Sequence, residues 1–131
     1  MADAIDSLSA KVELIAVAQA RGLPIVSSMG AGGRVDPSRV RVGDLMDTRE
    51  CGLARAVRTR LRRRGLGRGI TVVWSDEPPR PPLPPEAVSR GHPRAVNGTL
   101  SYMPAIFGLT LAGLVIRRIA EPQSASGSAG V

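Results

Sequence analysis

The chain has 131 residues, of which 43% are hydrophobic and only 2% aromatic, and its formal net charge is +7. This length suits one domain with a modest core, and the single cysteine excludes an internal disulfide and a zinc site made of cysteines alone. All but one of the 18 basic side chains are arginine, so the charge by itself is weak evidence for a nucleic-acid partner. The first residues lack the basic-then-apolar order of a signal sequence, and a reducing, cytoplasmic location is expected.

The first eleven residues predict a strand end that turns directly into a helix. Asp3-Ala-Ile-Asp6 ends the strand, a helix is expected over residues 9–21, and a short strand over 23–28 completes a strand–helix–strand unit. Ligands of open α/β sheets bind beside the carboxyl ends of the strands, so two carboxylates at this edge suit a metal-bound phosphate ligand. A strand that ends so close to residue 1 also predicts that earlier strands are missing.

A glycine-rich stretch, Met29-Gly-Ala-Gly-Gly33, permits two interpretations. It can be a phosphate-binding loop, but it does not match G-x-G-x-x-G opening a helix, because Arg34-Val-Asp-Pro37 has the composition of a turn. The favoured interpretation is a tight turn in which backbone approaches backbone. Residues 40–45 then predict a strand flanked by charge.

A strongly basic helix is expected over residues 52–64. Seven arginines stand between positions 55 and 68 with no carboxylate among them, beside a single apolar stripe. One interpretation is a contact surface for the phosphate backbone of RNA, and the other is a solvated face whose last arginines complement the helix dipole. The candidate RNA contacts are Arg55, Arg58, Arg62 and Arg63.

The second half of the chain predicts one buried strand and one long helix. Residues 70–75 are apolar almost throughout, which is typical of a central strand. The last helix is expected over residues 104–119, apolar nearly all round and therefore buried, with Gly108 and Gly113 allowing close backbone approach. Its apolar run of about fourteen residues is shorter than the roughly 20 that span a bilayer, so membrane association is the minority interpretation.

Two segments predict irregular structure. Residues 76–95 form a proline-rich loop, which also holds His92, the only histidine, without metal ligands at a suitable spacing. Residues 121–131 are small and polar and predict a disordered tail.

The order of these motifs resembles the ThiF-like superfamily of ATP-dependent adenylating enzymes, which includes the ubiquitin-activating enzymes. The first motifs that carry the resemblance are Asp3-Ala-Ile-Asp6-Ser7 with Lys11, then Pro24-Ile-Val-Ser-Ser-Met-Gly-Ala-Gly-Gly33 and Asp36-Pro37. The later segments look more specifically like the bacterial tRNA threonylcarbamoyladenosine dehydratases, and they are residues 40–45, 60–65, 72–79 and 98–113. The resemblance covers about residues 2–119.

This resemblance implies an α/β fold: the C-terminal half of a Rossmann-like, ThiF-type domain with a mixed sheet, spanning residues 1–120. It places Asp6 at a magnesium–ATP site as the catalytic and metal-binding acid, and it places Lys11 beside a nucleotide phosphate. The implied activity is an ATP-dependent dehydratase that adenylates the carboxylate of threonylcarbamoyladenosine in tRNA. An internal nitrogen or oxygen then closes a ring and expels AMP. The implied partners are tRNA and, in the full-length protein, a second copy of the chain.

Departures from the family keep two further hypotheses open. Activators of ubiquitin-like sulfur-carrier proteins often have paired CxxC motifs for zinc, and this chain has none, so no zinc is expected and that activity is the second hypothesis. The nucleotide-loop half and catalytic arginine of the family precede the Asp-x-x-Asp motif and are missing, so a truncated, inactive fragment is expected. The third hypothesis is a non-catalytic RNA-binding remnant. Cys51 replaces an acid of the dehydratases, either as an incidental loop residue or as a thiol activated beside a helix.

Overall fold

The computed structural model describes residues 1–81 and 100–121. Its strands are β1 (Ala2–Asp3), β2 (Val26–Ser28), β3 (Val40–Asp44) and β4 (Thr71–Ser75). Its α-helices are α1 (Leu8–Ala20), α2 (Gly52–Arg63) and α3 (Tyr102–Ala120), and two short 3-10 helices, η1 (Pro37–Arg39) and η2 (Leu45–Asp47), flank β3.

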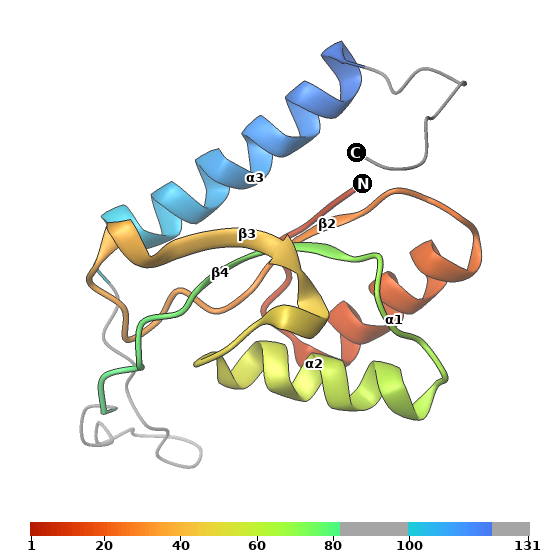
Figure 1. Cartoon of the computed structure of the whole chain (residues 1–131), viewed down its shortest axis with the longest axis horizontal. Helices are drawn as coiled ribbons and strands as arrows, with labels where there is room; N and C mark the ends of the chain where they lie inside the picture. Colours follow the sequence, from red (N-terminus) through yellow and green to blue (C-terminus); the bar gives the residue numbers. More distant parts are fainter. Residues whose placement is uncertain (82–99, 122–131) are drawn as a thin grey trace, which may run out of the picture.

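The strands form one mixed sheet in the order β1-β2-β4-β3. β1, β2 and β4 are parallel, and β3 pairs antiparallel with β4, which confirms the expected mixed sheet and the interior place of the strand at residues 71–75. The first two strands are joined through α1, so the expected strand–helix–strand unit is confirmed. In Figure 1 α1 and α2 lie on one side of the sheet and α3 on the other.

Each face of the sheet has its own apolar core. The side chains of a strand alternate between the two faces, and in β4 this alternation sends Val72 and Trp74 toward α1 and α2 and Val73 toward α3. On the first face, Arg64 of the turn after α2 forms an ion pair with Glu13 of α1 at 2.8 Å, which joins the two helices at the surface. The smaller core under α3 consists of Val26, Val73, Met103, Phe107 and Leu111.

The last helix differs from its prediction in position and in burial. It begins at Tyr102 rather than Pro104, and only one stripe of it is buried, while Leu109 and Ile119 are 74% and 75% exposed. Among the described residues, no atom outside the adjoining backbone of α3 lies within 4 Å of a Cβ added at Gly108 or Gly113. The predictions of a buried helix and of close backbone approach at these glycines are therefore wrong, because the sheet is the only layer that α3 packs against among the described residues.

The length of α3 also bears on the expectation about membranes. The helix has 19 residues, longer than the run predicted from sequence, and by length and composition alone it is able to cross a bilayer, with 17% of its most apolar window buried. The core helix of a globular protein passes the same test, so membrane association stays an untested minority prediction.

Several sequence predictions fall outside the described part of the chain. They are His92, the larger part of the proline-rich loop and the disordered tail beyond residue 121.

Candidate functional site

The first acid of the Asp-x-x-Asp motif is a buried structural group. Asp3 is 1% exposed at the end of β1, and its Oδ2 accepts hydrogen bonds from Lys11 Nζ at 2.6 Å and from Ser27 Oγ. Its Oδ1 accepts from the backbone N–H of Ile5 at 2.9 Å. Asp3 therefore ties the end of β1 to β2, to α1 and to the turn between β1 and α1.

The position of Lys11 does not fit its expected contact with a nucleotide phosphate. Its side chain is 0% exposed, and its ammonium donates to Asp3 Oδ2, to Ser27 Oγ at 3.3 Å and to the carbonyl oxygen of Ser28 at 2.9 Å. An ammonium has three N–H donors, so each has an acceptor inside the protein. In this structure Lys11 neutralises a buried carboxylate, and a ligand phosphate cannot reach it without breaking that pair.

The second acid, Asp6, lies where the sequence places it, beside the carboxyl ends of β1 and β2. It is exposed, and it lines two adjoining cavities of about 540 Å³ and 310 Å³. Among the described residues no group of three or more His, Cys, Asp or Glu side chains is placed to hold a metal ion. Magnesium often takes only one or two protein carboxylates and completes its coordination with phosphate and water, so Asp6 alone fits such a site.

The glycine-rich loop after β2 forms one wall of the larger cavity. Gly33 has φ +71°, its carbonyl oxygen accepts from Arg80 N at 3.0 Å, and a Cβ added there would lie 3.4 Å from the carbonyl oxygen of Arg80. The hydrogen bond between the backbones of Gly33 and Arg80 confirms the expected tight turn with close backbone approach, and the positive φ of Gly33 favours glycine there. Gly30 faces the opposite wall, where an added Cβ would lie 3.9 Å from Cys51 Sγ.

That opposite wall is the first turn of α2. Cys51 is the N-cap residue, 3% exposed, and its Sγ accepts from the backbone N–H of Ala54 at 3.4 Å. Gly52 and Leu53 line the cavity beside it, so the positive end of the helix dipole lies at this wall. Cys51 is therefore part of the helix start and of the cavity rather than an incidental loop residue.

Arg34 completes the larger cavity, and it was not among the residues predicted from sequence. It is 4% exposed, and its guanidinium donates to the carbonyl oxygens of Gly32, at 3.3 Å, and Glu50. These two bonds bridge the glycine-rich loop and the segment that enters α2. The sequence offered one signal that could have identified Arg34 as a site residue, because it is the first charged residue after the glycine-rich stretch.

The candidate RNA contacts on α2 do not share one environment. Arg55, Arg62 and Arg63 are exposed, whereas Arg58 is partly buried and donates to Thr48 Oγ1 and, at 2.8 Å, to the carbonyl oxygen of Thr48. Burial lowers the pKa of Arg58 from its ordinary value, and the positive charges of Arg62 and Arg55 lower it further. Arg58 thus holds the segment before α2, whereas Arg55, Arg62 and Arg63 have exposed side chains.

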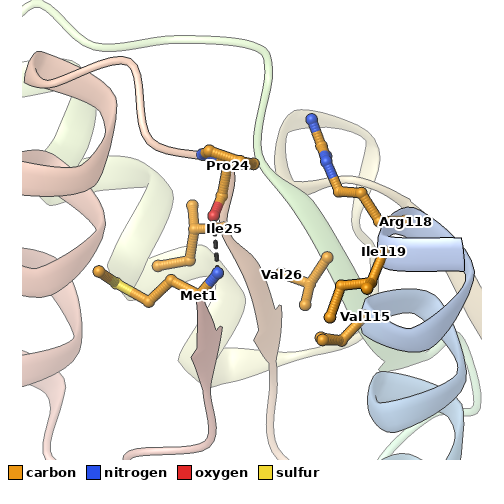
Figure 2. A pocket seen from close by; sticks show the side chains of 7 residues that line it. All are labelled: Met1, Pro24, Ile25, Val26, Val115, Arg118 and Ile119. Carbon is orange, nitrogen blue, oxygen red and sulfur yellow. Dashed lines mark hydrogen bonds between the residues drawn. The ribbon is translucent and has the colours of Figure 1, made fainter. Parts of the chain in front are cut away.

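A separate apolar cavity of about 320 Å³ lies at the amino ends of β1 and β2, the opposite end of these strands from Asp6. Figure 2 shows Val115 and Ile119 of α3 beside Val26 of β2, and the N-terminal ammonium of Met1 donating to the carbonyl oxygen of Pro24 at 2.9 Å. Its position and apolar lining separate it from the polar cavity of Asp6.

No protein-family model matches this chain. The chain is 38% identical to tRNA threonylcarbamoyladenosine dehydratase 2 of Saccharomyces cerevisiae, in an alignment that covers 91% of this chain and 30% of the yeast protein. It is 30% identical to tRNA threonylcarbamoyladenosine dehydratase of Bacillus subtilis, with 87% of this chain and 48% of that protein covered. The chain thus spans less than half the length of these curated relatives.

Solved structures agree with the sequence comparison. Escherichia coli tRNA N6-threonylcarbamoyladenosine dehydratase superposes with a TM-score of 0.76 at 31% identity, over 91% of this chain and 47% of that one. Crystals of the same enzyme with AMP and with ATP each give a TM-score of 0.74, at 29% and 30% identity. The chain is therefore homologous to one part of the tRNA threonylcarbamoyladenosine dehydratases.

Proposed function

We propose that this protein provides the acid-bearing part of an ATP-dependent site that adenylates the carboxylate of threonylcarbamoyladenosine in tRNA. The observation that carries the proposal is the exposed position of Asp6 beside the carboxyl ends of β1 and β2, in a cavity also lined by the glycine-rich loop and the start of α2. A carboxylate beside backbone N–H groups and a helix N-terminus suits a magnesium-bound phosphate. The names of the relatives, and the AMP and ATP bound to one of them, supply the substrate class.

The chemistry asked of these residues is charge stabilisation. Magnesium, when bound, would neutralise phosphate charge, and Asp6 is the residue that would hold it. Gly52 and Leu53, in the first turn of α2, line the same cavity, and their backbone N–H groups, which have no acceptor within the helix, would stabilise charge that develops as phosphorus is attacked. A carboxylate oxygen of the substrate bonds to the α-phosphorus as pyrophosphate leaves. A nitrogen or oxygen of the substrate then attacks the acyl carbon, and AMP leaves.

The tRNA-binding part of the proposal concerns the outer face of α2. Arg55, Arg62 and Arg63 are exposed there, and each lies on the surface without an ion pair to a carboxylate within the described residues. Cationic side chains on one face favour a phosphate backbone. The similarity to dehydratases favours the dehydratase over the sulfur-carrier activator and over the non-catalytic remnant.

We also propose that the full-length protein is a homodimer that uses the outer stripe of α3. Ala105, Leu109, Ala112, Ile116 and Ile119 are all exposed and follow one another at alternating steps of four and three residues. This spacing is the a/d pattern of helices that pair with one another. A cytoplasmic location, in keeping with the buried free thiol of Cys51, is part of the same proposal.

We infer that the cavity of Asp6 is one part of a larger site, because the chain spans only 30% and 48% of the lengths of the yeast and Bacillus subtilis relatives. We expect the purified 131-residue chain to catalyse no ATP–pyrophosphate exchange. Exchange by this chain alone, at a rate typical of its relatives, would contradict that expectation.

The test of the activity is a chimera in which residues 1–120 replace the matching segment of the Bacillus subtilis relative. The chimera is expected to catalyse ATP–pyrophosphate exchange that depends on magnesium. Removing a transition-state charge contact typically costs about 100-fold or more in rate, so Asp6→Asn in the chimera should lose at least that much. If the chimera is active and Asp6→Asn leaves its rate of ATP–pyrophosphate exchange unchanged, Asp6 does not take part in the reaction.

A further inference from the structure

Within the described residues, Arg34 is a buried cation without a counter-ion. Its side chain is 4% exposed, yet both of its hydrogen-bond acceptors, the carbonyl oxygens of Gly32 and Glu50, are neutral. Within the part of the chain that the structure describes, no carboxylate lies within 4.0 Å of it and its Nε–H has no acceptor. Buried charges in proteins are as a rule paired, because an unpaired one is costly to remove from water.

The surroundings of Arg34 are built to receive an anion. Its two hydrogen bonds place the guanidinium between the glycine-rich loop and the segment entering α2, the two walls of the cavity of about 540 Å³. The first turn of α2 contributes the positive end of its dipole and free backbone N–H groups at Gly52 and Leu53. Carbonyl acceptors hold the guanidinium in place, and its remaining donors match the two oxygens of a carboxylate or phosphate.

The other charges near the cavity do not already neutralise Arg34. Asp6 lines the same cavity but is exposed, and it makes no ion pair with any residue that the structure describes. The carboxylate of Glu77 accepts from the backbone N–H groups of Val35 and Asp36, at 3.0 and 2.9 Å, and so is engaged elsewhere. Cys51, at the N-cap of α2, brings no carboxylate to the wall that faces Gly30.

We propose that Arg34 and the first turn of α2 form an oxyanion subsite beside Asp6, which binds a carboxylate or a phosphate of the adenylation substrates. The existence of the subsite follows from the unpaired buried charge, and only the identity of its ligand rests on the proposed function. Two sources share this chemistry: the threonyl carboxylate of the modified nucleoside and the α-phosphate of the nucleotide. In either case Arg34 is a binding residue that orients the group that reacts.

The direct measurement is the NMR signal of the Arg34 Nε–H in the isotope-labelled 131-residue chain. Three probes are titrated, and all contain adenosine: adenosine itself, AMP, which adds a phosphate, and N6-threonylcarbamoyladenosine, which adds a threonylcarbamoyl group that ends in a carboxylate. A charged hydrogen bond contributes about 1.5–3 kcal/mol, so the anionic probe that uses the subsite should bind at least about tenfold more tightly than adenosine. Its binding should shift the Arg34 Nε–H signal and the amide signals of Gly30 and Gly52.

Two substitutions at Cys51 test the role of charge while Arg34 keeps its hydrogen bonds to the two loops. Asp and Ser are both good N-cap residues, so Cys51→Asp and Cys51→Ser should each preserve the start of α2. Cys51→Asp places a carboxylate beside the subsite and should weaken binding of the anionic probe at least about tenfold relative to Cys51→Ser. The same carboxylate pairs with Arg34, so Cys51→Asp should also have the higher melting temperature.

The outcomes distinguish a carboxylate ligand from a phosphate ligand, and they test the subsite separately from the proposed function. A preference for N6-threonylcarbamoyladenosine assigns the subsite to the carboxylate, and a preference for AMP assigns it to the phosphate. If both probes bind no better than adenosine, or if Cys51→Asp and Cys51→Ser bind them equally, the subsite is disproved. An inactive chimera together with anion binding at Arg34 would remove the proposed function and leave the subsite, whereas the reverse result would remove the subsite alone.

Discussion

At the scale of single residues, the two acids of the Asp-x-x-Asp motif have the same side chain and opposite roles. Asp3 is buried against Lys11 and Ser27, whereas Asp6 is exposed in the cavity. The sequence correctly placed Asp3 at a strand end, whereas Asp6, expected in the same strand end, lies in the turn that follows β1. The sequence could not predict that Lys11 turns inward, because that depends on Ser27, which lies 16 residues further along the chain.

The buried pair predicts a large effect on stability. Lys11→Met leaves the carboxylate of Asp3 buried without its cation, and breaking such a pair typically costs about 3–5 kcal/mol. The free energy of unfolding, measured by denaturant titration, should fall by that amount, and Asp3→Asn combined with Lys11→Met should recover part of it. A loss below about 1 kcal/mol in Lys11→Met would show that Lys11 is not an internal counter-ion and would reopen its contact with phosphate.

A second pair of residues predicts how stability depends on pH. A hydrogen bond from Arg39, followed by the positive charges of Arg39 and Arg41, holds the pKa of Asp76 below its ordinary value of 3.8. The unfolded chain therefore binds the proton more readily, so this contribution to stability is present above pH 3.8 and is lost as the pH falls through the lower folded value. Unfolding followed from pH 6 to pH 2 should show a smaller loss of stability for Asp76→Asn than for the unchanged chain, and equal losses would contradict the assignment.

At the scale of elements, local signals predicted well which segments are helices and strands. The α2 helix was expected at residues 52–64 and lies at Gly52–Arg63, because one apolar stripe and Gly65 define it within its own sequence. The burial of α3 was predicted wrongly, because the sequence of an apolar helix does not reveal whether other elements pack against one side of it or against both. Arg34 was missed for a similar reason, since its partners on two loops exist only in the folded chain.

The exposed arginines of α2 predict a salt-dependent affinity for tRNA. Arg62→Glu with Arg63→Glu should weaken binding about tenfold or more at low salt. The slope of log affinity against log salt concentration should become shallower by about two, because about two phosphate contacts are lost. The matched control is Arg117→Glu with Arg118→Glu, which makes the same change in net charge on α3, across the sheet. Filter binding at several salt concentrations measures the affinity of both variants for tRNA. Equal losses of affinity in the two variants would show that α2 attracts tRNA only through the net charge of the protein and is not a specific contact surface.

At the scale of the whole molecule, α3 covers one face of the sheet and leaves an apolar stripe of its own outside. The stripe predicts self-association, and Leu109→Lys with Ile116→Lys should shift the sedimentation coefficient of the chain from dimer to monomer. Both positions are exposed, so the substitutions should leave the fold intact, as circular dichroism can verify. A chain that is monomeric without the substitutions, or that sediments with lipid vesicles in place of dimerising, would contradict the proposed dimer.

The central claim is that Asp6 is the acid of an adenylating site that acts on threonylcarbamoyladenosine in tRNA. Its most direct test is mass spectrometry of tRNA incubated with ATP, magnesium and the chimera that has residues 1–120 of this chain. The account predicts loss of one water from the modified nucleoside, a loss that Asp6→Asn abolishes and that Arg117→Glu with Arg118→Glu preserves. A folded chimera that binds tRNA and ATP but never removes that water, or one that removes it equally well with Asp6→Asn, would contradict the account.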